Sequence, residues 1–176
     1  MAQEPTKIHK DNITLRMPNG TDGSDVWALV RECQPLDENS MYCNLIQCDH
    51  FAETCVLAEM NGQPVGWISG YLRPDAPDTL FVWQVAVSAA ARGKGLGRRM
   101  LTALLERDAC AGIEQIQTTI TKDNEASWAL FGSFARRNDA DLDSEAHFRR
   151  DQHFDGAHAT EHMVTITLSE AMSAAA

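Results

Sequence analysis

The sequence LFVWQVAV (80–87), followed by SAAARGKGLGRR (88–99) and MLTALL (100–105), decides the fold. Residues 80–87 are rich in β-branched and aromatic side chains, which is typical of a strand buried on both faces. After the glycines, apolar residues recur at the spacing of one helix face: Met100, Leu101, Leu104 and Leu105. The stretch therefore predicts a strand, a glycine-rich turn and a helix.

The turn itself is suited to binding phosphate. Residues 92–99 contain three glycines and four cationic side chains, although the chain as a whole carries a net charge of −10. Glycines let backbone N–H groups approach a ligand closely, and the free N–H groups at a helix start favour an anion. The alternative interpretation is an ordinary helix start with solvated cations.

The spacing of the glycines argues against two common nucleotide-binding loops. A Walker loop requires G-x-x-x-x-G-K-[ST], and no glycine pair has that spacing before Lys-Ser or Lys-Thr. The dinucleotide fingerprint G-x-G-x-x-G fails because Gly93 and Gly95 are followed by Arg98 where the third glycine is required. We therefore expect neither nucleotide hydrolysis nor dinucleotide binding.

The pattern Arg92-x-x-Gly95-x-Gly97 resembles the acetyl-CoA signature of the GNAT superfamily of N-acetyltransferases. This resemblance implies an α/β (α+β) fold, with a central mixed, mostly antiparallel sheet flanked by helices, and acetyl-CoA as co-substrate. In that family the loop amides bind the CoA pyrophosphate, and a bulge in the preceding strand polarises the thioester carbonyl. The cofactor-binding residues that it implies are Val85, Val87, Arg92, Gly93, Lys94, Gly95, Leu96, Gly97, Arg98, Asn124 and Phe131.

Phe131 departs from the pattern of many family members. Asn124 stands where the family places an asparagine that contacts the pantetheine arm, whereas Phe131 stands where a tyrosine often protonates the leaving thiolate. A phenylalanine cannot donate a proton, so the usual general acid is either missing or supplied from elsewhere. Because a thiol has a pKa of about 8.5, the CoA thiolate can leave without an acid near neutral pH.

The remaining pattern predicts a single domain over residues 13–168, which the resemblance implies to be an N-acetyltransferase, between a disordered leader (1–12) and a tail (169–176). A first strand and two helices precede a hairpin around Asn61-Gly62, and a loop is expected over 73–78. After the central unit we expect a strand over 115–121, a helix starting at Asn124 and a last strand over 163–168. The pattern assigns no structure to residues 135–160.

Composition limits the partners and the compartment. The acidic net charge disfavours nucleic-acid binding, and no run approaches the length of a membrane span. The first residues lack an apolar signal-peptide core, so a cytoplasmic protein is expected. The five cysteines are odd in number and form no C-x-x-C pair, which favours reduced thiols over disulfides or zinc.

A narrower resemblance concerns three further segments, PLDENSMY (35–42), FVWQ (81–84) and EHMV (161–164). Together they resemble the L-2,4-diaminobutyrate acetyltransferases, which acetylate the γ-amine in ectoine biosynthesis for osmoprotection. The resemblance implies a small diamino acid as substrate and, because the family is often dimeric, a homodimer. The alternatives are acetylation of another small polyamine or an amino-sugar, or a non-catalytic acyl-CoA-binding module.

The residues expected to bind the substrate are Asp37, Tyr42, Trp83, Glu161 and His162. Diaminobutyrate carries two ammonium groups, and selective acetylation requires one of them to be fixed by acids or by an aromatic face. Tyr42 and Glu161 are the candidate catalytic residues. Each residue also has a structural explanation, as a helix cap, a core aromatic or a solvated charge.

A zinc-peptidase pattern, H-x-x-E-H, spans residues 158–162. It requires a helix, where residues four apart share a face. The alternating run that follows predicts a strand here instead, and no metal site is expected.

Overall fold

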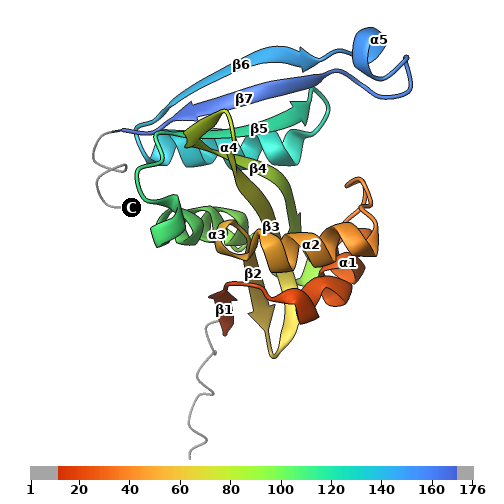
Figure 1. Cartoon of the computed structure of the whole chain (residues 1–176), viewed down its shortest axis with the longest axis vertical. Helices are drawn as coiled ribbons and strands as arrows, with labels where there is room; N and C mark the ends of the chain where they lie inside the picture. Colours follow the sequence, from red (N-terminus) through yellow and green to blue (C-terminus); the bar gives the residue numbers. More distant parts are fainter. Residues whose placement is uncertain (1–11, 170–176) are drawn as a thin grey trace, which may run out of the picture.

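The computed structural model describes residues 12–169 (Figure 1). The predicted leader and tail therefore fall almost wholly outside the described residues. The strands and helices, in chain order, are β1 (Ile13–Arg16), α1 (Gly23–Glu32), α2 (Met41–His50), β2 (Val56–Met60), β3 (Gln63–Arg73), β4 (Ala76–Val87), α3 (Leu96–Leu105), β5 (Gln115–Thr121), α4 (Glu125–Arg137), β6 (Asp141–Phe148), α5 (Arg150–His153) and β7 (Glu161–Thr167).

The strands form one seven-stranded sheet in the order β1-β2-β3-β4-β5-β7-β6. Neighbouring strands are antiparallel except for β4 and β5, which are parallel. The predicted fold class, a mixed and mostly antiparallel sheet flanked by helices, is confirmed. Among the described residues, no helix is long and apolar enough to cross a bilayer.

Helices cover the two faces of the sheet unequally (Figure 1). On one face, α3 and α4 pack over the length of the sheet, and their buried residues share a core with Val56, Leu80 and Val164. On the other face, α1 and α2 pack only over β2, β3 and β4, in a second core around Leu57 and Trp67. Among residues 12–169, therefore, neither α1 nor α2 covers that second face over β5, β7 and β6.

A bulge at Trp83 changes which alternate residues of β4 face the α3–α4 core. Ser69 pairs with Gln84 and Gly70 with Val82, which leaves Trp83 as the extra residue. Before the bulge Val82 belongs to the α3–α4 core, whereas after it Val85 packs against that core. The bulge that the resemblance implied is therefore present at Trp83.

One prediction about local structure needs correction, and the structure also fills one segment that the pattern left unassigned. The expected loop at 73–78 is wrong in extent, because β3 runs to Arg73 and β4 begins at Ala76, where pairing with β3 outweighs the presence of proline. The unassigned segment 135–160 contains β6 and α5. β6 is a largely exposed edge strand, so its pairing with β7, and not an apolar pattern, makes it a strand.

Candidate active site

The cleft lies where β4 and β5 separate. The two strands pair only from Thr79↔Gln115 to Phe81↔Gln117, although β4 continues to Val87 and β5 to Thr121. Beyond Phe81, the edge of β4 that faces β5 has no strand partner in the described part of the chain. Backbone groups without a strand partner can bind an extended amide-containing chain, as in strand addition.

The glycine loop leads from the end of β4 to α3. Gly95 occupies the position before the first helical residue with a left-handed φ of 69°, and Gly93 has a φ of 75°. The Arg92 Nε donates to the Val87 carbonyl at 3.1 Å, which holds the loop against the end of β4. A Cβ on Gly97 would meet Leu130 of α4 at 3.1 Å, so this glycine lets the two helices approach closely. The free N–H groups at the start of α3 thus follow a loop that is bonded to the end of β4.

A hollow of about 230 Å³ occupies the gap between the strands. Its walls come from the bulge, from the 35–39 loop after α1, from β5, from the start of α4 and from the residues around the start of β7. Of the predicted site residues, it brings together Asp37, Trp83, Val85, Asn124, Phe131 and Glu161. Asn124 also begins α4, where its Oδ1 accepts from the Ser127 N–H at 3.1 Å.

Two carboxylates and a histidine face each other in this cleft. The His158 Nε2 lies 3.8 Å from a Glu161 oxygen and 3.9 Å from an Asp37 oxygen. The His158 Nδ1 lies 2.8 Å from the Ala159 carbonyl, which can only accept, so Nδ1 carries the proton. Nε2 therefore faces the two acids.

Glu161 is the more buried member of the pair. Its side chain is 17% exposed, whereas that of Asp37 is 89% exposed. Burial raises the pKa of Glu161 above its ordinary value, and nearby His158 partly opposes that shift. One Glu161 oxygen is buried and makes no hydrogen bond within the described structure. A buried carboxylate with an unused oxygen is well suited to accept a hydrogen bond from an ammonium group.

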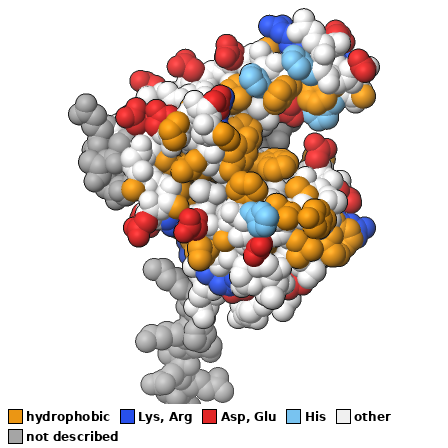
Figure 2. Space-filling model, in the orientation of Figure 1, with side chains coloured by type: hydrophobic (Ala, Val, Ile, Leu, Met, Phe, Trp, Pro, Cys, Tyr) orange, Lys and Arg blue, Asp and Glu red, His pale blue; other side chains and the backbone are white. Residues whose placement is uncertain are grey.

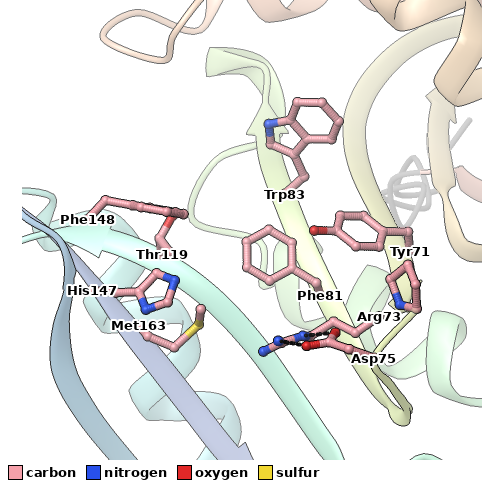
Figure 3. Close-up of a pocket in the computed structure, with 10 residues that line it drawn as sticks. Tyr71, Arg73, Asp75, Phe81, Trp83, Thr119, His147, Phe148 and Met163 are labelled. Atoms are coloured by element: carbon pink, nitrogen blue, oxygen red, sulfur yellow. Dashed lines mark hydrogen bonds and ion pairs between the residues drawn. The ribbon is translucent and has the colours of Figure 1, made fainter. Parts of the chain in front are cut away.

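An aromatic hollow of about 420 Å³ adjoins the cleft at Trp83 and Thr119 (Figure 3). Trp83, Phe81 and Tyr71 approach it from β3 and β4, and Phe148 and Met163 from β6 and β7. Trp83 is 51% exposed, so it is a surface aromatic on a bulge and not a core residue. Figure 2 shows hydrophobic side chains gathered between strands β6 and β7 on one side and helices α1 and α2 on the other.

Two predicted substrate-binding residues do not line the cleft. Tyr42 lies on α2 with 72% of its surface exposed. His162 follows Glu161 on β7, so its side chain points to the opposite face of the sheet and lines a separate hollow with Lys122 and Arg149. Their roles in substrate binding stay predictions.

Sequence reasoning assigned no site role to His158, Asn39 or Gln84, which all line the cleft. His158 belongs to the H-x-x-E-H pattern, and Asn39 and Gln84 lie within the segments that carried the narrower resemblance. The position of His158 next to Asp37 could not be predicted, because residues 149–160 are mostly polar and show no apolar periodicity.

The H-x-x-E-H pattern is not helical, as predicted, since Glu161 and His162 begin β7. Over residues 12–169, no group of three or more His, Cys, Asp or Glu side chains has an arrangement that could hold a metal ion.

The Acetyltransferase (GNAT) family model matches residues 24–135. The fold also matches that of the ribosomal-protein-S18-alanine N-acetyltransferase from Escherichia coli, at 19% identity and a TM-score of 0.61, over 89% of this chain and 92% of that one. The chain belongs to the GNAT family of acetyltransferases.

Within that family, the similarity extends to one group of enzymes. The chain is 47% identical to the L-2,4-diaminobutyric acid acetyltransferase of Methylotuvimicrobium alcaliphilum, over 97% of this chain and 99% of that protein. It is 46% identical to the enzyme of that name from Vibrio parahaemolyticus, over 88% and 85% of the two chains. It is also similar to diaminobutyrate acetyltransferase EctA from Paenibacillus lautus, whose structure holds its substrate L-2,4-diaminobutyric acid and coenzyme A. That match has 37% identity and a TM-score of 0.86, over 90% of this chain and 96% of that one.

Proposed function

We propose that this enzyme transfers the acetyl group of acetyl-CoA to the γ-amine of L-2,4-diaminobutyrate, forming N4-acetyl-L-2,4-diaminobutyrate in ectoine biosynthesis. The observation that carries the proposal is the placement of Asp37, Glu161 and Trp83 around one gap between β4 and β5. The glycine loop follows the end of β4, where Arg92 bonds to Val87. This arrangement combines a seat for CoA phosphates with two acids and an aromatic face for a dication. The named relatives support the same substrate.

CoA would bind with its pyrophosphate on the glycine loop and its pantetheine arm along the open edge of β4. The N–H groups of residues 93–97 and the start of α3 would bind the phosphates, and Asn124 would contact the arm. The thioester would then lie at the bulge, where backbone amides next to Trp83 stabilise the oxyanion that develops on its carbonyl.

The reaction would be a direct attack of the amine on the thioester. An alkyl ammonium has a pKa of about 10.4 and must lose a proton before it can attack. Glu161 would accept that proton first, and the neutral nitrogen would then form the N–C bond as the C–S bond breaks to release CoA thiolate. The second proton would leave the nitrogen for solvent, which yields the amide. With Phe131 buried at the position of the family's tyrosine, the thiolate takes its proton from solvent.

The choice between the two amines follows from the charges around Trp83. Asp37 and Glu161 offer two separate carboxylates to the two ammonium groups, and the indole face offers a cation–π contact. When one ammonium is held by Asp37, the other is free to reach the thioester.

The test is to incubate the protein with acetyl-CoA and diaminobutyrate, follow thiol release and identify the product. We expect turnover with acetylation at the γ-nitrogen. Acetylation at the α-nitrogen, or no turnover, would contradict the proposal. A panel of polyamines and amino-sugars separates the alternative substrates, and tight acetyl-CoA binding without turnover of any amine would indicate a non-catalytic binding module.

We also propose that two copies associate through the uncovered face of β5, β7 and β6. This face carries Phe148, which is 40% exposed, beside the aromatic hollow. A sheet face that is left without helices and displays aromatic side chains is typical of an interface. A second copy would cover it, as the family resemblance suggests.

The proposed compartment is the cytoplasm. The substrate acetyl-CoA is a cytoplasmic metabolite, and all five cysteines are free thiols, four of them buried. Thiols remain reduced in that compartment. The partners in this proposal are the small substrates and a second copy, and neither nucleic acid nor a membrane has a role.

A further inference from the structure

Gln84 is a buried polar residue that follows the bulge in β4. It is 9% exposed, pairs with Ser69 of β3 and has Trp83 and Val85 as its chain neighbours. The bulge turns its side chain toward the α1–α2 side of the sheet, away from the α3–α4 core. A buried amide in this position must find hydrogen-bond partners.

Both ends of the Gln84 amide bond to the loop that carries Asp37. The Gln84 Nε2 donates to the Asp37 backbone carbonyl at 2.9 Å, and the Gln84 Oε1 accepts from the Asn39 Nδ2 at 3.2 Å. The Trp27 Nε1 donates to the Asn39 carbonyl at 3.1 Å, which ties the same loop to α1. The backbone of the loop is thus fixed, while the Asp37 carboxylate remains exposed to the cleft.

We infer that Gln84 is a positioning residue that fixes the Asp37 loop at a set distance from the thioester site. The inference rests on the proposed function, because it assumes that Asp37 binds one ammonium of the substrate. The backbone of Gln84 directly follows the bulge residue Trp83. Its side chain makes two hydrogen bonds to the Asp37 loop. It therefore sets the distance between the group that holds the non-reacting amine and the amides that hold the reacting carbonyl.

This distance matters because the two amines of the substrate differ mainly in their position along a short carbon chain. Displacing a reactive group by about 1 Å can lower a rate by about 100-fold. A loosened loop would let the substrate bind in more than one orientation, and the α-amine could then reach the thioester. Gln84 would act on substrate selection and leave the binding of CoA unchanged.

The experiment compares Gln84→Met, Gln84→Glu and Asn39→Ala with a matched control, Gln47→Met. Gln47 is also a buried glutamine that bonds to an asparagine, Asn44, but it lies on α2 outside the cleft. Gln84→Glu keeps the shape and the acceptor and removes the donor, which separates the hydrogen bond from mere packing. Steady-state kinetics, calorimetric acetyl-CoA binding and the ratio of α- to γ-acetylated product are measured for each.

We expect Gln84→Met and Gln84→Glu to raise the KM for diaminobutyrate at least tenfold and to yield α-acetylated product, with acetyl-CoA affinity within twofold. Asn39→Ala should raise this KM about threefold, and adding it to Gln84→Met should have no further effect. An unchanged KM and product ratio, a parallel loss of acetyl-CoA affinity, or an equal effect of Gln47→Met would overturn the inference. If Gln84→Met fails to fold, an unchanged KM in Asn39→Ala overturns it. Wild-type turnover of diaminobutyrate is measured first, so failure of the proposed function is recognised separately.

Discussion

The two halves of the sheet are built differently. In β3 six consecutive residues, 65–70, are buried because helices cover both faces of this half. In β5 buried and half-buried residues alternate strictly, because α4 is the helix that covers this half among the described residues, and it covers one face. The first half therefore forms a frame that is packed on both sides, whereas the second half leaves one face of the sheet open.

The cleft lies where these two halves part, so its residues come from both. The covered half contributes the bulge and Asp37, and the open half contributes Thr119, His158 and Glu161. Substitutions in the two halves should therefore have different consequences for activity and stability.

The largest expected effect is that of Glu161→Gln in the open half. Removing the proposed proton acceptor should lower kcat/KM at least about 100-fold. The same change should stabilise the fold at pH 7, because burial raises the pKa of Glu161 and makes the ionised side chain unfavourable in the folded state. A wild-type carboxyl with a raised pKa costs stability as the pH rises above its ordinary value of 4.5, so the gain should vanish below about pH 4.5.

Thermal unfolding across pH 4–8 and kinetics at pH 7 measure both effects. The exposed Glu114, which precedes β5 in the same half, offers a control as Glu114→Gln. An active Glu161→Gln enzyme, or one that is less stable than the wild type at pH 7, would contradict the assignment.

Gly93→Asp tests whether the glycine loop, which leads from β4 to α3, binds the phosphates of CoA. Gly93 has a φ of 75° and nothing within 4 Å of the position that a Cβ would take, as is also true of Gly62 in the β2–β3 turn. Both Asp variants should therefore lose about 1 kcal/mol of stability through backbone strain. Only Gly93→Asp should weaken acetyl-CoA binding, by at least about tenfold, because it places a negative charge where phosphates bind.

Calorimetric titration with acetyl-CoA and chemical denaturation give these two quantities. Equal acetyl-CoA affinity in the Gly93 and Gly62 variants would contradict the proposal that the glycine loop binds the CoA phosphates.

Phe148→Glu tests whether a second copy covers the open half. A buried charge in a predominantly apolar interface should shift the protein toward monomers by at least about tenfold in the dissociation constant. Sedimentation velocity at several concentrations measures that shift. Met17, which is 52% exposed beyond β1 at the other end of the sheet, provides the control Met17→Glu. A wild-type protein that is monomeric at all concentrations would remove the proposed interface.

The same contrast explains what could be predicted from the sequence. The central strand, the glycine loop and the helix that begins after Asn124 carry apolar periodicity and caps, and these local signals are retained in the fold. β6 was missed because an exposed edge strand such as DLDSEAHF carries no such pattern.

Site residues divide in the same way. Asp37, Trp83, Asn124, Phe131 and Glu161 could be named because they lie in motifs, and the structure brings them to one cleft. The contact of His158 with both acids depends on the path of a polar loop, which local sequence does not determine. Tyr42 was named from its motif, but it lies on the exposed side of α2.

The smallest effect on activity is expected from Arg16→Met at the far edge of the frame. Arg16 donates to Asp22 at 2.7 and 2.8 Å and to Glu59 at 2.7 Å, which joins β1 to the start of α1 and to β2. Its loss should reduce the free energy of unfolding by about 1–2 kcal/mol at pH 7, measured by urea denaturation.

Hydrogen bonds from Arg16 lower the pKa of Asp22, so this stability is present above the ordinary carboxyl pKa of 3.8 and disappears as the pH falls through the lowered value. The difference between variant and wild type should therefore shrink in acid, while kcat/KM at pH 7 stays within twofold because the cleft lies elsewhere. Arg136→Met, at an exposed position in the last turn of α4, should change stability by less than about 0.5 kcal/mol. A large loss of activity in Arg16→Met would mean that the covered half is not a passive frame.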